Sequence, residues 1–150
     1  NKEHEITIED KRLVNALKTV RKGKGQRLFR FPGKKRKTRE LNANILNTYI
    51  REAAGARISA KDFRTWAGTV SAARVLCETE PPTSPTDAKR KIAACCRTVS
   101  GLLGNTPTVC RSSYIHPKVL KRFEAGELAD ALPGPDAKSF ETRLRLMLAE

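Results

Sequence analysis

The stretch that decides the fold reads Ser59-Ala60-Lys61-Asp62-Phe63-Arg64-Thr65-Trp66-Ala67-Gly68-Thr69-Val70-Ser71-Ala72-Ala73. Ser59 followed three residues later by Asp62 resembles a capping box with Asp in place of Glu, so we expect Ser59 to cap a helix. Apolar side chains then recur at helical spacing on one face, at Phe63, Trp66, Val70 and Ala73. This pattern predicts a long amphipathic helix, which ends before Pro81, and a helical domain built around it.

Helix start and stop signals lie on both sides of this stretch. Asp10 can cap a helix that runs to about Val20, and Asn42 or Asn44 begins a helix that stops at Gly55. Four more helices are expected towards the C-terminus: Thr86 to about Leu103, Thr106 to about Ser113, one that begins at Pro117, and one from about Asp136.

Each expected helix has an apolar face that can contribute to a core. The side chains expected to point inward include Leu13, Leu17, Val20, Ile45, Leu46, Tyr49, Ile50, Ile92, Cys95 or Cys96, Val99, Leu102, Val119, Leu120, Phe123, Phe140, Leu144, Met147 and Leu148. A chain of 150 residues can bury a core of this kind without disulfides.

Strand signals are few. Residues 4–8 alternate polar and apolar side chains, which is typical of a short strand, and residues 28–31 are the other candidate. Because a strand needs a partner, we expect the chain to start inside a hairpin whose upstream half is missing. The predicted fold class is mainly α: a compact multi-helix domain with a short β remnant at the N-terminus.

The charge is unevenly distributed. The chain has 30 Lys and Arg against 16 Asp and Glu, a net charge of +14, and 11 of these cations lie between Lys18 and Arg39 with no acidic residue among them. Such a run can be a solvated loop, but its density favours a stripe that binds phosphates. Its candidate nucleic-acid-binding residues are Lys34, Lys35, Arg36, Lys37 and Arg39.

Other partner classes have less support. An anionic membrane would also attract positive charge, but no apolar run approaches the roughly 20 residues of a membrane span, and the first ten residues lack a signal-peptide pattern. The four cysteines form no CxxC pair and the chain has only two His, so we expect no metal site. We expect reduced, apolar cysteines in a cytosolic protein.

Three places could carry chemistry. Lys61 and Arg64 lie three residues apart on one helix face, where two cations repel each other unless an anion sits between them. Asn105 precedes a helix N-terminus, which can hold a phosphate. The Tyr114 hydroxyl can be a nucleophile. Each also has a plainer interpretation, namely an exposed ion pair, a capping turn and a packing residue, and pattern alone leaves these open.

Two longer motifs change this balance. Residues 61–69, Lys61-Asp62-Phe63-Arg64-Thr65-Trp66-Ala67-Gly68-Thr69, resemble the arginine-bearing motif of type IB DNA topoisomerases of the bacterial and poxvirus-like branch. Residues 103–117, Leu103-Gly104-Asn105-Thr106-Pro107-Thr108-Val109-Cys110-Arg111-Ser112-Ser113-Tyr114-Ile115-His116-Pro117, resemble the active-site tyrosine motif of the same branch. Weaker similarity covers most of the chain, so residues 1–150 resemble the C-terminal part of the catalytic domain.

The resemblance implies a mechanism without metal, ATP or other cofactor. Tyr114 would attack a backbone phosphate of duplex DNA, leaving a 3′-phosphotyrosyl bond and a 5′-hydroxyl that later reseals the strand. Arg64 would clamp a phosphate oxygen and Asn105 would hydrogen-bond the same phosphate. Lys61 matches a family lysine that helps proton transfer to the leaving oxygen. Arg111, within the tyrosine motif, is a further candidate DNA contact.

The resemblance also implies an incomplete site. The family constellation has a further Arg and a Lys general acid, for which this chain offers no good candidate; Lys2 fits best after the catalytic Lys. We therefore expect these 150 residues alone to be inactive or weakly active. His116 is assigned a role in a turn. The expected protein is monomeric, cytoplasmic and associated with the nucleoid.

Two alternatives remain. A tyrosine recombinase or integrase uses the same chemistry, but recombinases usually have His where Lys61 stands. A non-enzymatic, basic helical DNA-binding module would need no nucleophile, and in it Tyr114→Phe would change nothing.

Overall fold

A computed structural model describes residues 5, 7–22, 27–32, 38–132, 134 and 138–150. The chain divides into two compact units, Asn1–Ala60 and Lys61–Glu150, here called the N-terminal and C-terminal units. Within the described residues the structure is mainly α, as predicted. None of the described helices is long and apolar enough to cross a membrane.

Among the residues that the structure describes, the N-terminal unit contains two helices and a small hairpin. Its elements are α1 (Lys11–Arg21), β1 (Arg30–Pro32), β2 (Thr38–Glu40) and α2 (Ala43–Ala54). The predicted caps are confirmed: the Asp10 carboxylate accepts a hydrogen bond from the Leu13 N–H at 2.8 Å, and the Asn42 amide accepts one from the Ile45 N–H at 3.0 Å. Gly55 ends α2 in the left-handed region, at φ 61°.

The β structure is only partly where the sequence pattern placed it, since β1 overlaps the candidate strand at residues 28–31. Glu5, Thr7 and Ile8 are in no strand, while His4 and Ile6 lie outside the described residues. Instead, β1 and β2 pair antiparallel, with Phe31 opposite Arg39. The Arg39 guanidinium lies 5.9 Å from the centroid of the Phe31 ring. The candidate strand at 28–31 thus finds its partner at the C-terminal end of the basic run, a segment without a strand signal of its own.

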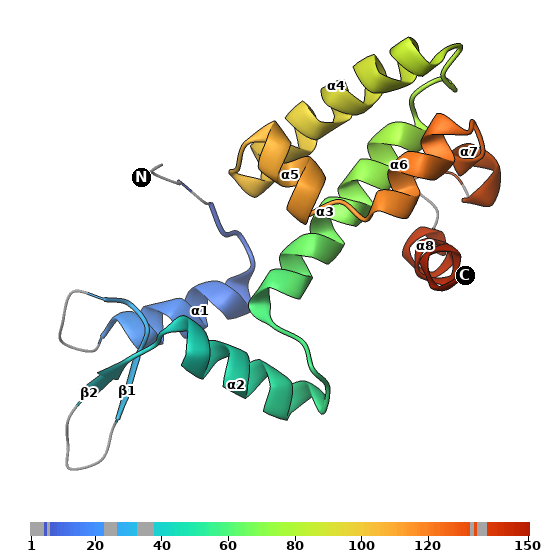
Figure 1. The fold of residues 1–150 in the computed structure, drawn as a ribbon. Helices are drawn as coiled ribbons and strands as arrows, with labels where there is room; N and C mark the ends of the chain where they lie inside the picture. The colour runs from blue at the N-terminus through green and yellow to red at the C-terminus, as the bar shows by residue number, and fades with distance from the viewer. Residues whose placement is uncertain (1–4, 6, 23–26, 33–37, 133, 135–137) are drawn as a thin grey trace. The chain divides into compact units, whose positions relative to one another are not determined.

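Six helices form the described part of the C-terminal unit (Figure 1). They are α3 (Ala60–Cys77), α4 (Pro85–Leu103), α5 (Pro107–Ser113), α6 (Pro117–Glu124), α7 (Leu128–Ala131) and α8 (Phe140–Ala149). Helix α4 contacts both α5 and α6, and α6 contacts α7. The two predicted signals at the α4–α5 junction are confirmed, because Gly104 caps α4 at φ 67° and Thr106 caps α5.

All the fully buried apolar side chains of the described chain lie in the C-terminal unit, between Val70 and Met147. The largest of them are Phe140, Leu76, Ile92, Leu128 and Leu144. They come from α3, α4, α7 and α8, so one core joins helices that are distant in sequence. By contrast, no described residue of the N-terminal unit is fully buried.

Some expectations about individual residues are wrong. Tyr49, Phe63 and Leu102 are exposed rather than inward-facing, at 67%, 60% and 71%. Phe63 lies on the first turns of α3, before the buried part begins at Gly68, and on α4 the inward positions near the end are Val99 and Ser100. Helix α4 starts two residues early, because Ser84 rather than Thr86 caps it, with a proline at the first turn. Helix α7 was not predicted.

Candidate active site

Helix α3 carries both candidate cations on one face. Lys61, Arg64 and Gly68 stand at i, i+3 and i+7, which places them in one row along the helix. At a rise of about 1.5 Å per residue, this row is about 10 Å long. Lys61 and Arg64 are exposed, whereas Gly68 begins the buried part of the helix. The row therefore runs from the surface into the core of the C-terminal unit.

Tyr114 lies directly after α5, where it forms the C-cap of that helix. Its backbone N–H donates to the Cys110 carbonyl at 3.0 Å, and its side chain is half-buried. The ring centroid lies 5.2 Å from the guanidinium carbon of Arg64 and 5.9 Å from the Lys61 ammonium. Both distances are within the range of cation–π contacts. Three predicted catalytic residues therefore come together in space, although Tyr114 is 50 residues from Arg64 along the chain.

Arg64 is also tied to the loop before α5. Its Nη2 donates a hydrogen bond of 2.7 Å to the carbonyl of Leu103, the last residue of α4. A guanidinium has five N–H donors in a planar fork. One anchor on the protein therefore orients the group, and further donors stay available for a ligand at the exposed end of the row.

The backbone around Tyr114 rests on α3. A Cβ atom added at Gly68 would lie 2.5 Å from the Tyr114 carbonyl oxygen, closer than real atoms come. The neighbouring Thr69 hydroxyl donates to that same oxygen at 3.5 Å and accepts a hydrogen bond from the His116 N–H at 3.1 Å. His116 in turn caps α6, because its Nδ1 accepts from the Lys118 N–H at 3.2 Å, which confirms its predicted role in a turn.

Asn105 lies in the loop between α4 and α5, two residues after the carbonyl that Arg64 holds. Its backbone N–H donates to the Ser100 carbonyl at 3.1 Å. Both polar atoms of its side chain, Nδ2 and Oδ1, are buried and have no hydrogen-bond partner within the described structure. Burying an amide without a partner costs about 1–3 kcal/mol. The Asn105 side chain therefore has unused hydrogen-bonding capacity in the described structure.

The chain contains two motifs whose residues meet at one tyrosine, and the comparison with known families agrees with them. Residues 1–130 match the family described as eukaryotic DNA topoisomerase I, catalytic core. The chain belongs to this family. It is also similar to DNA topoisomerase 1B of Acanthamoeba polyphaga mimivirus, at 26% identity over 125 residues. That match covers 79% of this chain and 37% of the viral protein, so the chain spans little more than a third of its curated relative's length.

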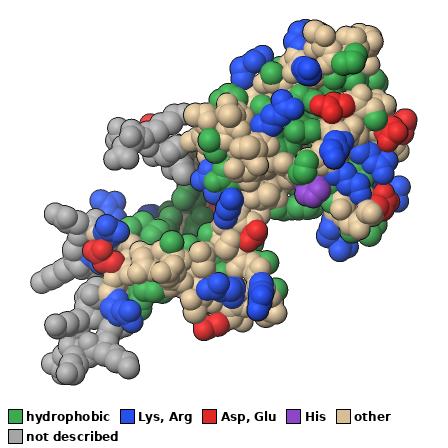
Figure 2. All heavy atoms as spheres, viewed as in Figure 1, with side chains coloured by type: hydrophobic (Ala, Val, Ile, Leu, Met, Phe, Trp, Pro, Cys, Tyr) green, Lys and Arg blue, Asp and Glu red, His purple; other side chains and the backbone are tan. Residues whose placement is uncertain are grey.

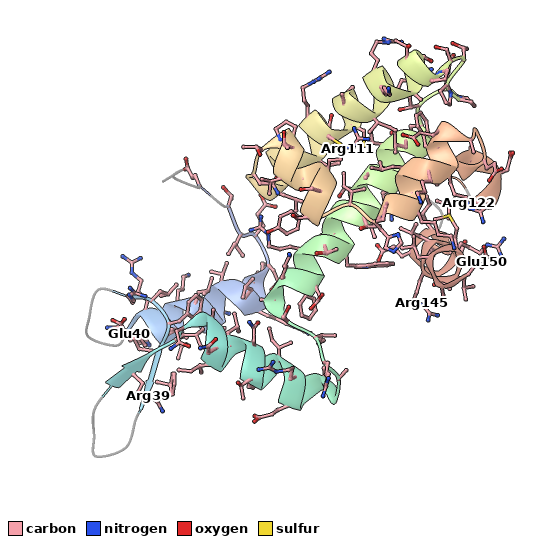
Figure 3. All side chains as sticks on the ribbon, in the orientation of Figure 1. Arg39, Glu40, Arg111, Arg122, Arg145 and Glu150 are labelled. Carbon is pink, nitrogen blue, oxygen red and sulfur yellow. The ribbon has the colours of Figure 1, made fainter. Side chains whose placement is uncertain are left out.

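The DNA-contact candidates of this topoisomerase-family chain are only partly placed. Lys34, Lys35, Arg36 and Lys37 lie outside the described residues. Arg39 is exposed on β2 and faces Phe31, while the neighbouring Glu40 pairs with Arg27 at 3.0 Å (Figure 3). Figure 2 shows Lys and Arg side chains scattered over the visible face of the described structure, in both units.

Arg111, the last of these candidates, lies on α5 (Figure 3). It lines an open groove of about 800 Å³ between α4, α5 and α6, together with two further cations, Arg97 and Lys121. Sequence reasoning did not single out those two. Since they stand in different helices, no local pattern could have brought them together with Arg111.

The residues that seat Tyr114 were also missed, although both belong to the quoted arginine motif. Gly68 continues the Lys61–Arg64 spacing by one turn, and Thr69 is a hydroxyl residue between Gly68 and the apolar Val70. These two signals mark a close backbone approach and a buried hydrogen bond. Neither residue indicates which distant segment of the chain lies against it. Only the structure shows that this segment is the backbone of residues 114–116.

Cys95, Cys96 and Cys110 are buried core residues, and Cys77 is partly buried against the same core. All four are free thiols, and burial raises the pKa of Cys95 to about 12 and also raises the pKa of Cys96 and Cys110. Thiols in such surroundings are neither nucleophilic nor good metal ligands. Within the described residues, no group of three or more His, Cys, Asp or Glu side chains is arranged to hold a metal ion.

Proposed function

We propose that this chain is the tyrosine-bearing part of a type IB topoisomerase, which nicks and reseals one strand of duplex DNA. The observation that carries the proposal is the ring of Tyr114 facing Arg64 and Lys61, 5.2 and 5.9 Å from its centroid. Two cations beside the ring of one tyrosine suit a phosphate diester, which brings negative charge and gains more as it is attacked. Membership of the topoisomerase I family supports the same reaction.

In the proposed nicking step, Tyr114 Oη attacks the phosphorus. One Oη–P bond forms and the bond from phosphorus to the 5′ oxygen breaks. Tyr114 releases its proton, and the departing 5′ oxygen takes up a proton to become a hydroxyl. Because a phenol is a stronger acid than an alkyl alcohol, the Tyr114 phenolate is a good leaving group from the phosphotyrosyl ester when the 5′-hydroxyl attacks in the return step. The hydroxyl can then reseal the strand with no other energy source.

The neighbouring side chains have distinct proposed roles. Arg64 donates its fork to a non-bridging phosphate oxygen, and its bond to the Leu103 carbonyl holds it in the orientation to do so. Lys61 assists proton transfer to the leaving oxygen. The Asn105 amide, buried and without a partner among the described residues, supplies hydrogen bonds to the same phosphate once the loop and DNA meet. An amide does not titrate, so Asn105 acts as a donor and not as an acid.

Duplex DNA is the proposed partner, because the net charge of +14 suits a polyanion. Most of that charge lies in the N-terminal unit, which has 16 basic and 6 acidic residues. The C-terminal unit has 14 and 10. We propose that the first unit supplies most of the attraction to the phosphate backbone and that the second holds one phosphate for reaction.

The test is covalent capture on a nicked suicide substrate, whose cleaved end diffuses away so that resealing is blocked. It uses the complete gene product that contains this chain and, in parallel, the 150 residues alone. We expect the wild-type gene product to form a covalent adduct and Tyr114→Phe to form none while still binding DNA. Tyr49→Phe is the matched control, since Tyr49 is the chain's other tyrosine and lies exposed on α2.

Two outcomes would contradict the proposal. Adduct formation by Tyr114→Phe would assign the nucleophile elsewhere, and unchanged behaviour of that variant in every assay would favour a non-enzymatic DNA-binding module. Relaxation of supercoils distinguishes the topoisomerase from a recombinase, which exchanges strands between defined sites. Robust capture by the 150 residues alone would show that they need no further catalytic cations, against our expectation.

A further inference from the structure

Thr69 behaves differently from several other threonines on the described helices. Thr19, Thr65 and Thr98 each donate a hydrogen bond to the carbonyl four residues earlier in their own helix, at 3.0, 3.1 and 3.4 Å. This is the usual local option for a helical threonine. Thr69 instead directs its hydroxyl to another segment, where it contacts the Tyr114 carbonyl and the His116 N–H. It is 2% exposed, so this hydroxyl has no water to replace those partners.

Gly68, which has no side chain, allows the backbone at Tyr114 to lie close to the backbone of α3. The Tyr114 carbonyl lies where a Cβ of residue 68 would be, and a Leu103 methyl group lies 3.1 Å from that position. The backbone after α5 therefore lies directly against the backbone of α3, with no side chain between them. Ile115 and Cys110 are buried on either side of Tyr114, at 4% and 0% exposure, which limits sliding along the helix.

The contact of Gly68 and Thr69 with the Tyr114 segment lies on the same helix as Arg64 and Lys61. Gly68 and Thr69 lie one turn after Arg64 and two turns after Lys61, on the same rigid helix. The element that presents the cations is thus also the element that seats the tyrosine. Residues 114–116 join α5 to α6, and within this short connection the Tyr114 carbonyl and the His116 N–H are both bonded to Thr69 of α3.

We propose that Thr69 is a positioning residue for Tyr114: its hydroxyl, with Gly68 beside it, holds the nucleophile in register with Arg64 and Lys61. The inference rests on the proposed function, because Thr69 can position a nucleophile only if Tyr114 is one. Thr69 itself would not touch DNA. The inference predicts that the hydroxyl of Thr69 affects the rate of the chemical step and leaves DNA binding alone.

The first experiment compares Thr69→Val and Thr69→Ser in the complete gene product. At saturating suicide substrate, Thr69→Val should form the covalent adduct about 10²-fold more slowly, as expected for a misplacement of about 1 Å, with an unchanged Kd for DNA. Thr69→Ser keeps the hydroxyl and should restore most of the rate. Thr98→Val is the matched control, because it removes a hydroxyl that bonds only its own helix. A full rate in Thr69→Val, or an equal loss in Thr69→Ser, would overturn the proposal.

A second measurement does not depend on catalysis. The His116 amide donates to Thr69 Oγ1, whereas the Tyr114 amide donates to the Cys110 carbonyl. Hydrogen exchange should therefore become faster at His116 in Thr69→Val and stay the same at Tyr114. Unchanged exchange at His116 would show that the contact does not hold the segment, whatever the enzyme does. Adduct formation by Tyr114→Phe would instead refute the proposed function and leave this exchange result standing.

Gly68→Ala covers the case in which Thr69→Val does not fold. Its added methyl group would displace the Tyr114 carbonyl while the Thr69 hydroxyl remains. Slower adduct formation with an unchanged Kd for DNA would support the proposed positioning of Tyr114 by α3. A wild-type rate in a folded Gly68→Ala variant would refute it.

Discussion

The two units of the chain differ in how they use their residues. The N-terminal unit has a net charge of +10 and no fully buried residue among those described, whereas the C-terminal unit has only +4 and all the fully buried apolar side chains. The candidate nucleophile and both of its cations belong to the second unit. Attraction to a polyanion depends on the amount of charge, but placing one hydroxyl against one phosphate depends on rigid packing. Our proposal assigns these two tasks to different segments of the chain.

The capping motifs show that local sequence alone does not create this difference. Helices α1 and α2 have well-formed N-caps from Asp10 and Asn42, as α4 and α5 have from Ser84 and Thr106. What α1 lacks is a core against which to pack, since even Leu13 and Val20 on its apolar face are exposed. A helix can thus begin and end as its sequence predicts without contributing a buried side chain to its unit.

The sharpest test of this contrast is core truncation. Phe140→Ala should lower the free energy of unfolding of the C-terminal unit by about 3–5 kcal/mol, because Phe140 is fully buried in the core. Leu17→Ala on α1 should cost less than about 1 kcal/mol, since Leu17 is only partly buried. Urea unfolding followed by far-UV circular dichroism reports on the helices of both units, and the fluorescence of Trp66, the chain's only tryptophan, reports on the C-terminal unit alone. Equal losses of unfolding free energy in the two variants would contradict the claim that, among the described residues, only the C-terminal unit has a packed core.

The next largest effect is expected at Arg64. Arg64→Ala should slow adduct formation by about 10²–10³-fold, the usual cost of losing one donor to a transition-state oxygen. Arg64→Lys should recover little, because an ammonium cannot replace the planar fork on the phosphate and the Leu103 carbonyl at once. Arg145→Ala on α8 removes an equal charge from the same unit and should have a small effect. A similar loss in both variants would mean that net charge, and not the placed fork, drives the reaction.

How much of this could be predicted from sequence depends on whether a feature is local. The caps at Asp10, Asn42 and Thr106 and the stops at Gly55 and Gly104 follow from neighbouring residues and are confirmed. The pairing of β1 with β2 and the contact of Thr69 with Tyr114 join segments that no local pattern connects. The site residues themselves were identified through long motifs, and only the structure shows why Gly68 belongs to the first of them.

The basic run allows a test of the role that we propose for the N-terminal unit, namely attraction to the DNA backbone. Changing Lys34, Lys35, Arg36 and Lys37 to Gln should flatten the dependence of DNA affinity on salt, by as much as about 0.9 in the log–log slope for each phosphate that the variant no longer neutralises. Neutralising Lys89, Lys138, Arg143 and Arg145 of the C-terminal unit is the matched control and should change the slope less. A slope that stays the same after the first substitution would make the run a solubilising loop.

The smallest effect concerns ion pairs. Hydrogen bonds from Lys91 and Arg90, at 2.9 and 2.6 Å, and from the Thr83 backbone hold the pKa of Asp87 well below its ordinary value of 3.8. The ionised carboxylate therefore stabilises the fold above that value, and this contribution is lost as the pH falls below it. Asp87→Asn should lower Tm at neutral pH, with the difference shrinking in acid.

Glu40→Gln supplies the matched control for that measurement. It breaks the Arg27–Glu40 pair, whose side chains are 69% and 55% exposed, and an exposed pair contributes little. Its Tm should therefore change less than that of Asp87→Asn. A pH-independent difference for Asp87→Asn would show that the carboxylate acts through its shape and not through its charge.

The central claim is that the tyrosine seated on α3 is the nucleophile, and peptide mapping of the trapped adduct tests it most directly. After capture on a suicide substrate and digestion of protein and DNA, the nucleotide remnant should be found on the peptide that contains Tyr114, joined through its 3′ phosphate. The peptide that contains Tyr49 should carry none. A remnant on Tyr49, a 5′-phosphate linkage, or DNA cleavage with no covalent remnant on either tyrosine would contradict the account.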